Sequence, residues 1–124
     1  QLMTPHFTNN SSARDITVLH TELIILFSNT DYPLQSFTRE GILLRTILNK
    51  QQVNFALYFT MDINNNYIIS DNQDNNIKIF NRIGKLIANI GNKGQIKNPH
   101  GISLDLNNKL IICDEKNKYK LQAF

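Results

Sequence analysis

The sequence predicts an all-β fold made of repeated units of four strands, and three observations support this prediction. Residues 61–71 align with 104–114 at a spacing of 43, and the aspartates, the paired asparagines and the paired isoleucines stay in register. Isoleucine, which suits strands, occurs 17 times and asparagine, which suits turns, occurs 18 times, although an AT-rich coding sequence would give the same bias. Apolar and polar residues alternate along 76–79, as in a strand with one buried face.

Turn residues divide the middle unit of the repeat into strands. Turns rich in asparagine, or containing glycine, lie at 64–66, 72–76 and 82–84 and separate four apolar stretches. Gly84 ends the last of these turns and Gly41 stands 43 residues earlier, so both fit a hairpin position with positive φ. We expect the strands at about 57–62, 66–71, 76–81 and 85–91.

The flanking units are less regular than the middle one. Residues 15–48 form a degenerate first unit, in which 15–27 also fit a helical stripe, but the repeat register favours strands. Residues 49–91 form the second unit and residues 92–124 the third, which lacks an outer strand after Phe124. Residues 1–14 precede these units and are a candidate closing strand.

A period near 43 residues with four strands is typical of one blade of a β-propeller. A single blade cannot bury both of its faces, so neighbouring blades must stack around an axis. With about three blades, the chain is expected to be a segment of a six-bladed ring within a larger protein. We expect the remaining blades of that protein, or a second copy, to close the ring, and the isolated chain to dimerise or aggregate.

The third unit resembles the NHL repeat. Residues 94–105, which contain Pro99, Gly101 and Asp105, match its Pro-x-Gly-Ile-x-Val-Asp motif, and strands ending in Asp114 and Phe124 follow. The second unit keeps the aspartates and the phenylalanine of this pattern without its proline and glycine, and the first keeps only the phenylalanine and a glycine. The resemblance spans residues 15–124 and implies a propeller like those of tripartite-motif NHL proteins.

The NHL resemblance implies a binding platform rather than one defined activity. The main hypothesis is a protein-interaction platform within a larger protein, such as a ubiquitin ligase, with another protein as its partner. One alternative is an RNA-binding propeller of the tripartite-motif type. A second alternative is part of a propeller lyase or sensor protein.

Composition narrows the classes of function further. A net charge of +3 is too small to indicate a nucleic-acid binder by itself. The single cysteine, Cys113, excludes an intrachain disulfide and a multi-cysteine zinc site, and we expect it to be a small buried side chain. No apolar run reaches the roughly 18 residues of a membrane span, so we expect a cytoplasmic location and no membrane partner. No serine–histidine–acid set or glycine-rich phosphate loop occurs, so no catalytic site, cofactor or metal is expected within the chain.

Alternating strand directions bring five connections to one end of the ring, the end where such propellers usually bind ligands. These connections are 28–33, 49–57, 71–76, 91–100 and 114–119. They hold five basic and five acidic residues and therefore carry no net charge, which does not favour RNA. The candidate ligand-contacting residues there are Tyr32, Lys50, Lys93, Lys97, His100, Lys116, Lys118 and Tyr119.

A second set of residues recurs at fixed positions of the repeat, and we assign it a structural role. Its carboxylates have the chemistry to bind metal or transfer protons, but their repetition favours hydrogen bonds to backbone N–H groups of the following turns. These positions are Asp62, Asp71, Asp105, Asp114, Phe37, Phe80, Phe124, Gly41 and Gly84.

Overall fold

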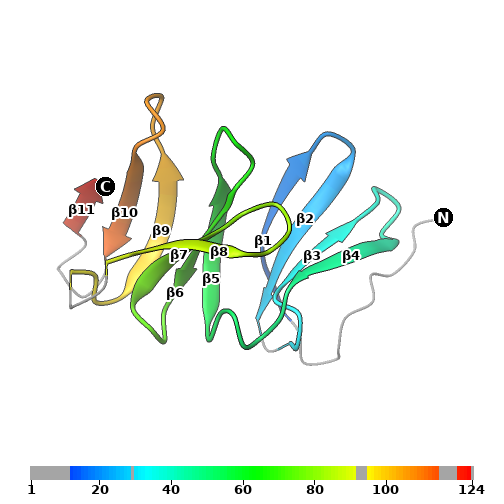
Figure 1. The fold of residues 1–124 in the computed structure, drawn as a ribbon, viewed down its shortest axis with the longest axis horizontal. Helices are drawn as coiled ribbons and strands as arrows, with labels where there is room; N and C mark the ends of the chain where they lie inside the picture. The colour runs from blue at the N-terminus through cyan, green and yellow to red at the C-terminus, as the bar shows by residue number, and fades with distance from the viewer. Residues whose placement is uncertain (1–11, 29, 92–94, 115–119, 124) are drawn as a thin grey trace.

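The structure is a computed structural model that describes residues 12–28, 30–91, 95–114 and 120–123. Within these ranges the chain forms eleven strands and no helix, so no described helix is long and apolar enough to cross a membrane. The strands form three antiparallel sheets that lie side by side, with the second sheet between the other two (Figure 1). The all-β prediction is confirmed.

In each sheet the strands pair in the order in which they occur in the sequence. The first sheet consists of β1 (Ser12–Leu19), β2 (Glu22–Ser28), β3 (Leu34–Phe37) and β4 (Leu43–Leu48). The second consists of β5 (Ala56–Met61), β6 (Tyr67–Asp71), β7 (Asn76–Phe80) and β8 (Leu86–Ile90). The third consists of β9 (Pro99–Leu104), β10 (Leu110–Asp114) and β11 (Lys120–Ala123).

The strands of the second sheet begin and end within one residue of the predicted ranges. In the first sheet, strands rather than a helix form at 15–27, because β1 and β2 pair across a turn at His20 and Thr21. This sheet begins at Ser12, earlier than the expected residue 15. The difference arises because Ser12 pairs with Ser28 beyond a bulge in β1, which a pattern of alternating residues does not reveal.

Aspartates hold the turns between the first two strands of the second and third sheets. The Asp62 carboxylate accepts hydrogen bonds from the backbone N–H groups of Asn64 and Asn66, both at 2.9 Å. Asp105 accepts the equivalent pair of bonds 43 residues later, at 2.8 and 2.9 Å. A central asparagine in each turn has a positive φ, 63° in one and 62° in the other, which asparagine tolerates better than most residues.

The turns between the third and fourth strands carry glycine at equivalent positions. Gly41 and Gly84 both have a φ of 87°, a conformation that costs a residue with a Cβ atom. At Gly84 an added Cβ would also lie 2.4 Å from the carbonyl oxygen of Ile47. Glycine is therefore required at position 84 by both conformation and space.

Most of the apolar core lies in the two interfaces between the sheets, whereas Phe27 and Phe37 are buried together on the other face of the first sheet. The interface of the first and second sheets buries Ile24, Leu26, Leu34, Phe59, Tyr67, Ile69 and Phe80. The interface of the second and third sheets buries Ile68, Ile77, Ile96, Leu110 and Ile112. Cys113 of the third sheet is half-buried rather than buried as expected from the sequence. Since full burial of one such side chain is worth about 1.5–3 kcal/mol, the stack of sheets rather than any single sheet is the stable unit.

Candidate functional site

The connections of the fold fall at two opposite ends. The loop end comprises the described residues that link β2 to β3 (30–33), β4 to β5 (49–55), β6 to β7 (72–75) and β8 to β9 (91 and 95–98). The turn end comprises the hairpin turns at 20–21, 38–42, 62–66, 81–85 and 105–109. Because each strand runs antiparallel to its neighbour, these two sets lie at opposite ends of the stack (Figure 1).

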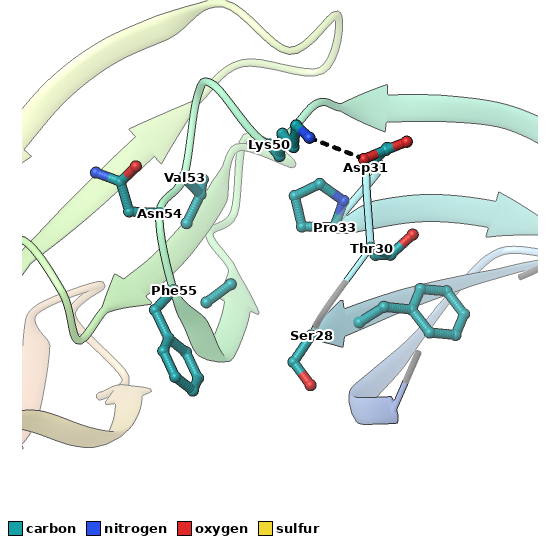
Figure 2. Close-up of a pocket in the computed structure, with 10 residues that line it drawn as sticks. Ser28, Thr30, Asp31, Pro33, Lys50, Val53, Asn54 and Phe55 are labelled. Carbon is teal, nitrogen blue, oxygen red and sulfur yellow. Dashed lines mark ion pairs between the residues drawn. The ribbon is translucent and has the colours of Figure 1, made fainter. Parts of the chain in front are cut away.

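A hollow of about 290 Å³ opens at the loop end between the first and second sheets (Figure 2). One wall comes from the end of β2 and the connection after it, and the other comes from the segment that leads into β5. The lining residues are Phe27, Ser28, Thr30, Asp31, Pro33, Lys50, Val53, Asn54, Phe55 and Ala56. The structure thus brings together two segments about twenty residues apart in sequence.

The hollow has a polar rim, and apolar residues are packed beneath it. Phe27, Val53 and Ala56 are buried, whereas Phe55 is 42% exposed. On the rim, Lys50 Nζ lies 3.2 Å from Asp31 Oδ1, and the side chains are 61% and 70% exposed. Such an exposed ion pair contributes at most about 1 kcal/mol to stability, so both charges can be redirected to a ligand at little cost.

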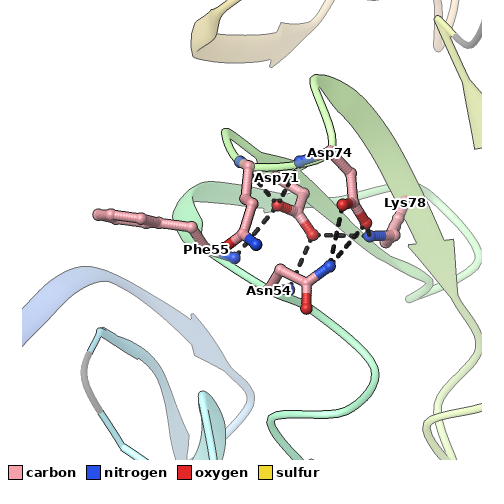
Figure 3. Close-up of polar contacts among 6 residues, drawn as sticks. Asn54, Phe55, Asp71, Asp74 and Lys78 are labelled. Carbon is pink, nitrogen blue, oxygen red and sulfur yellow. Dashed lines mark hydrogen bonds and ion pairs between the residues drawn. The ribbon is translucent and has the colours of Figure 1, made fainter.

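The wall formed by Asn54 and Phe55 is held by a buried carboxylate (Figure 3). Asp71, at the end of β6, has no exposed surface and accepts N–H bonds from Asn54 at 2.9 Å and Phe55 at 3.1 Å. Its Oδ2 also lies 2.6 Å from Lys78 Nζ. The carboxylate therefore fixes the backbone that carries two lining residues of the hollow.

Lys78 and Asp74 complete this network. The Lys78 ammonium contacts both Asp71 and Asp74, and the Asn54 side-chain amide donates to both oxygens of Asp74 at 2.9 Å. Three charges on neighbouring segments are thus paired among themselves. Asn54 is held at its backbone by Asp71 and at its side chain by Asp74.

Hydrogen bonding determines the charge states in this network. Burial raises the pKa of Asp71, but the bonds from Lys78 and from the backbone of Asn54 and Asp74 outweigh it and hold the pKa below its ordinary value. Burial lowers the pKa of Lys78, but its bonds to the two aspartates outweigh that effect and raise the pKa above its ordinary value. Asp71 and Lys78 are therefore both charged at neutral pH.

Asp114 occupies the equivalent position in the third sheet. It is fully buried and accepts N–H bonds from Lys97 and Asn98, both at 3.0 Å. Asp71 accepts N–H bonds from Gln73 and Asp74 in the following turn, as the sequence predicts. Asp71 and Asp114 also hold the connection that precedes the first strand of their own sheet, which the sequence analysis did not predict. The reason is that each first strand pairs with the second, so the preceding connection returns beside the aspartate.

The structure places the sequence-predicted ligand contacts at several separate points of the loop end. Lys50 lines the hollow, whereas Tyr32 is 48% exposed outside it and Lys97 is exposed before the third sheet. His100, in β9, lies beside Tyr58 of β5 with 6.1 Å between ring centroids. Four further candidates and one repeat position lie outside the described residues: Lys93, Lys116, Lys118, Tyr119 and Phe124.

Sequence reasoning missed most of the lining of the hollow. Val53, Asn54 and Phe55 precede a strand and carry no motif, but they align at a spacing of 43 with Ile96, Lys97 and Asn98. That alignment could have identified these residues from the sequence. In each triplet the last two residues donate their backbone N–H groups to the buried aspartate of their own sheet. Among the described residues no group of three metal-ligating side chains occurs.

Comparisons with known proteins support the fold. No protein-family model matches the chain, and no curated protein matches it. The virginiamycin B lyase of Staphylococcus aureus superposes with a TM-score of 0.71 and 14% identity over 100% of this chain and 45% of that one. A streptogramin B lyase gives 0.70 and 17% over 98% and 43%. A protein of unknown function from Bacteroides caccae gives 0.61 and 10% over 86% and 40%.

The fold and these superpositions define the class of protein. The chain is a β-propeller segment whose sheets do not close a ring within the described residues. It spans less than half the length of these structural neighbours. Membership of the NHL family remains a resemblance, because no family model matches.

Proposed function

We propose that the chain supplies the substrate-binding end of a propeller lyase, with the hollow between the first two sheets as the binding site. Two neighbours that superpose over nearly the whole chain are lyases, which favours this alternative over a ubiquitin ligase or an RNA-binding propeller. The observation that carries the proposal is the loop-end hollow with its exposed Phe55 and its paired charges.

The shape and charge of the hollow favour a small organic ligand over RNA or a flat protein surface. A concave site of about 290 Å³ is close to the lower limit of typical small-molecule pockets. RNA binding requires an excess of positive charge, but each lysine around the hollow lies beside a carboxylate, Lys50 beside Asp31 and Lys78 beside Asp71 and Asp74, so no positive excess results there. A protein-interaction platform would instead present a broad contact area.

Each wall of the hollow has a definite role in this proposal. The exposed Phe55 side chain packs against the hydrocarbon part of the ligand. The Asp31 carboxylate accepts hydrogen bonds from ligand N–H or O–H groups, and the Lys50 ammonium donates to ligand carbonyl oxygens. These residues bind and orient the substrate, and the network around Asp71 keeps their backbone in place.

Calorimetric titration with quinupristin tests the proposal, because one neighbouring structure is a catalytically inactive lyase variant with that compound. We expect Phe55→Ala to weaken binding about tenfold, since the ring supplies apolar contact worth roughly 1–1.5 kcal/mol. Tyr32→Ala is the matched control, because Tyr32 is an exposed aromatic at the same end outside the hollow. No binding by the folded protein, or equal losses in both variants, would contradict the proposal.

A further inference from the structure

Four hairpin turns at the turn end share one pattern of hydrogen bonds. In each five-residue turn, the N–H of the first residue donates to the carbonyl of the fifth, and the N–H of the fourth donates to the carbonyl of the first. A side-chain oxygen of the first residue also accepts the N–H of the fifth, at 2.9–3.1 Å. The fourth residue always has a positive φ. These turns are 38–42, 62–66, 81–85 and 105–109.

The second and third residues of each turn lie at the tip of the hairpin, and three of the four tips carry an aliphatic side chain. Ile63 is 82% exposed, Ile83 is 83% exposed and Leu106 is fully exposed. They are the three most exposed of the large apolar side chains that the structure describes. Single exposed apolar side chains are common on protein surfaces, but three on equivalent tips at one end indicate a contact surface.

Basic side chains accompany these aliphatic tips. The four turns hold four basic residues, all exposed, and none of them makes an ion pair with a described residue. The turns also hold three acidic residues. Two of these, Asp62 and Asp105, accept N–H bonds within their own turns, and the third is Glu40. The groups available to a charged partner are therefore mainly cationic: Arg39, Arg82, Lys85 and Lys109.

We propose that the turn end binds the surface of an anionic lipid bilayer. Ile63, Ile83 and Leu106 insert at the boundary of the acyl chains, and the four basic side chains contact the lipid phosphates. The β5–β6 and β9–β10 hairpins, which carry Ile63 and Leu106, point the same way (Figure 1). A fluid bilayer accommodates each separate tip where it stands, whereas a protein partner would need a matching pocket for each.

This contact is independent of the hollow, which opens at the opposite end of the stack. Further sheets beside the first or the third would leave the tips exposed, because the tips lie at the end of the stack and not on the face of a sheet. The sequence-based expectation of no membrane partner rested on the absence of a long apolar run, and insertion of turn tips requires no such run.

Co-sedimentation with lipid vesicles tests the proposal. We expect vesicles of phosphatidylcholine with about 30% phosphatidylserine to bind the protein at least about tenfold more tightly than phosphatidylcholine alone. Leu106→Ser should weaken binding about tenfold, because it removes one inserted side chain. Ile16→Ser is the matched control and should leave binding unchanged, since Ile16 is an exposed aliphatic residue in the middle of β1. No binding, which would favour a protein partner, or equal losses in both variants would overturn the proposal.

The basic residues have a separate test with the same vesicles. The double variant Arg82→Gln and Lys85→Gln should weaken binding to the anionic vesicles by about tenfold or more, since each cation near such a surface contributes roughly fivefold. It should also make the remaining binding less sensitive to salt. Lys97→Gln, an exposed lysine at the loop end, is the control and should bind as the wild type does. Unchanged binding by the double variant would overturn the electrostatic part of the proposal.

Tryptophan fluorescence tests which end of the molecule meets the bilayer. The chain contains no tryptophan, so a single introduced tryptophan reports only on its own surroundings. Leu106→Trp and Ile83→Trp should each shift their emission to shorter wavelength on anionic vesicles, because the ring moves from water to the lipid interface. Tyr32→Trp, at the loop end, is the control and should keep its emission wavelength. No shift at either tip, or an equal shift at position 32, would overturn the proposed orientation.

Discussion

Asp71 is the residue on which the loop end depends. Its carboxylate joins the end of β6 to the connection before β5 and to the Lys78 ammonium, and it has no exposed surface. A charge in such a place is stable only while all of its partners remain. Asp114 accepts the equivalent backbone N–H bonds in the third sheet, so a buried aspartate fixes the connection before the first strand in both sheets.

Asp71→Asn should destabilise the protein by about 3 kcal/mol, because Lys78 then stays buried beside an uncharged amide. Asp74→Asn is the matched control and should cost no more than about 1 kcal/mol, since the Asp74 side chain is 37% exposed. Urea unfolding of the three proteins at one protein concentration measures both effects. Equal losses would show that burial does not distinguish the two carboxylates.

The pKa shifts of Asp71 and Lys78 determine how the difference in stability between the wild type and Asp71→Asn depends on pH. The pKa of Asp71 lies below its ordinary value of 3.8, so its stabilisation is complete above that value and is lost as the pH falls through the window beneath it. The pKa of Lys78 lies above 10.5, so its contribution is complete below that value and is lost as the pH rises further. The stability gap between wild type and Asp71→Asn should therefore stay constant from about pH 5 to 10.

Among the elements, the hairpins of the turn end set the register of each sheet. The turn from β7 to β8 reverses the chain through Gly84, whose φ of 87° and proximity to the Ile47 carbonyl leave no room for a side chain. The turns after β5 and β9 reverse through asparagines that an aspartate carboxylate holds. Because the side-chain period of a strand is two, these turns decide which face of the next strand is buried.

Gly84→Ala should lower the free energy of unfolding by about 2 kcal/mol, from the strained φ together with the contact with Ile47. Gly101→Ala is the matched control, because its added Cβ would only reach ordinary contact, 4.0 Å from the Cβ of Cys113. We expect that control to change stability by less than about 0.5 kcal/mol. Thermal and urea unfolding compare the two, and a larger loss at Gly101 would contradict this account of the turn.

At the scale of the whole molecule, the repeat predicted the fold well and the binding site poorly. Stacked sheets require the same apolar positions in each unit. Phe59 and Ile102 could therefore be recognised from their spacing of 43 residues as equivalent positions of two units. The hollow depends instead on how two polar connections meet. The Lys50 N–H donates to the Asp31 carbonyl at 2.9 Å, a backbone contact that no side-chain pattern encodes.

Mapping of backbone amide chemical shifts during titration with quinupristin tests the central claim most directly, because it locates a ligand without assuming the site. The account predicts that the largest shifts occur at Lys50, Asn54 and Phe55, the described lining on the side of the second sheet. The turns at 62–66 and 81–85, at the opposite end, should keep their shifts. Shifts concentrated in those turns, with none around the hollow, would contradict the placement of the ligand site at the loop end.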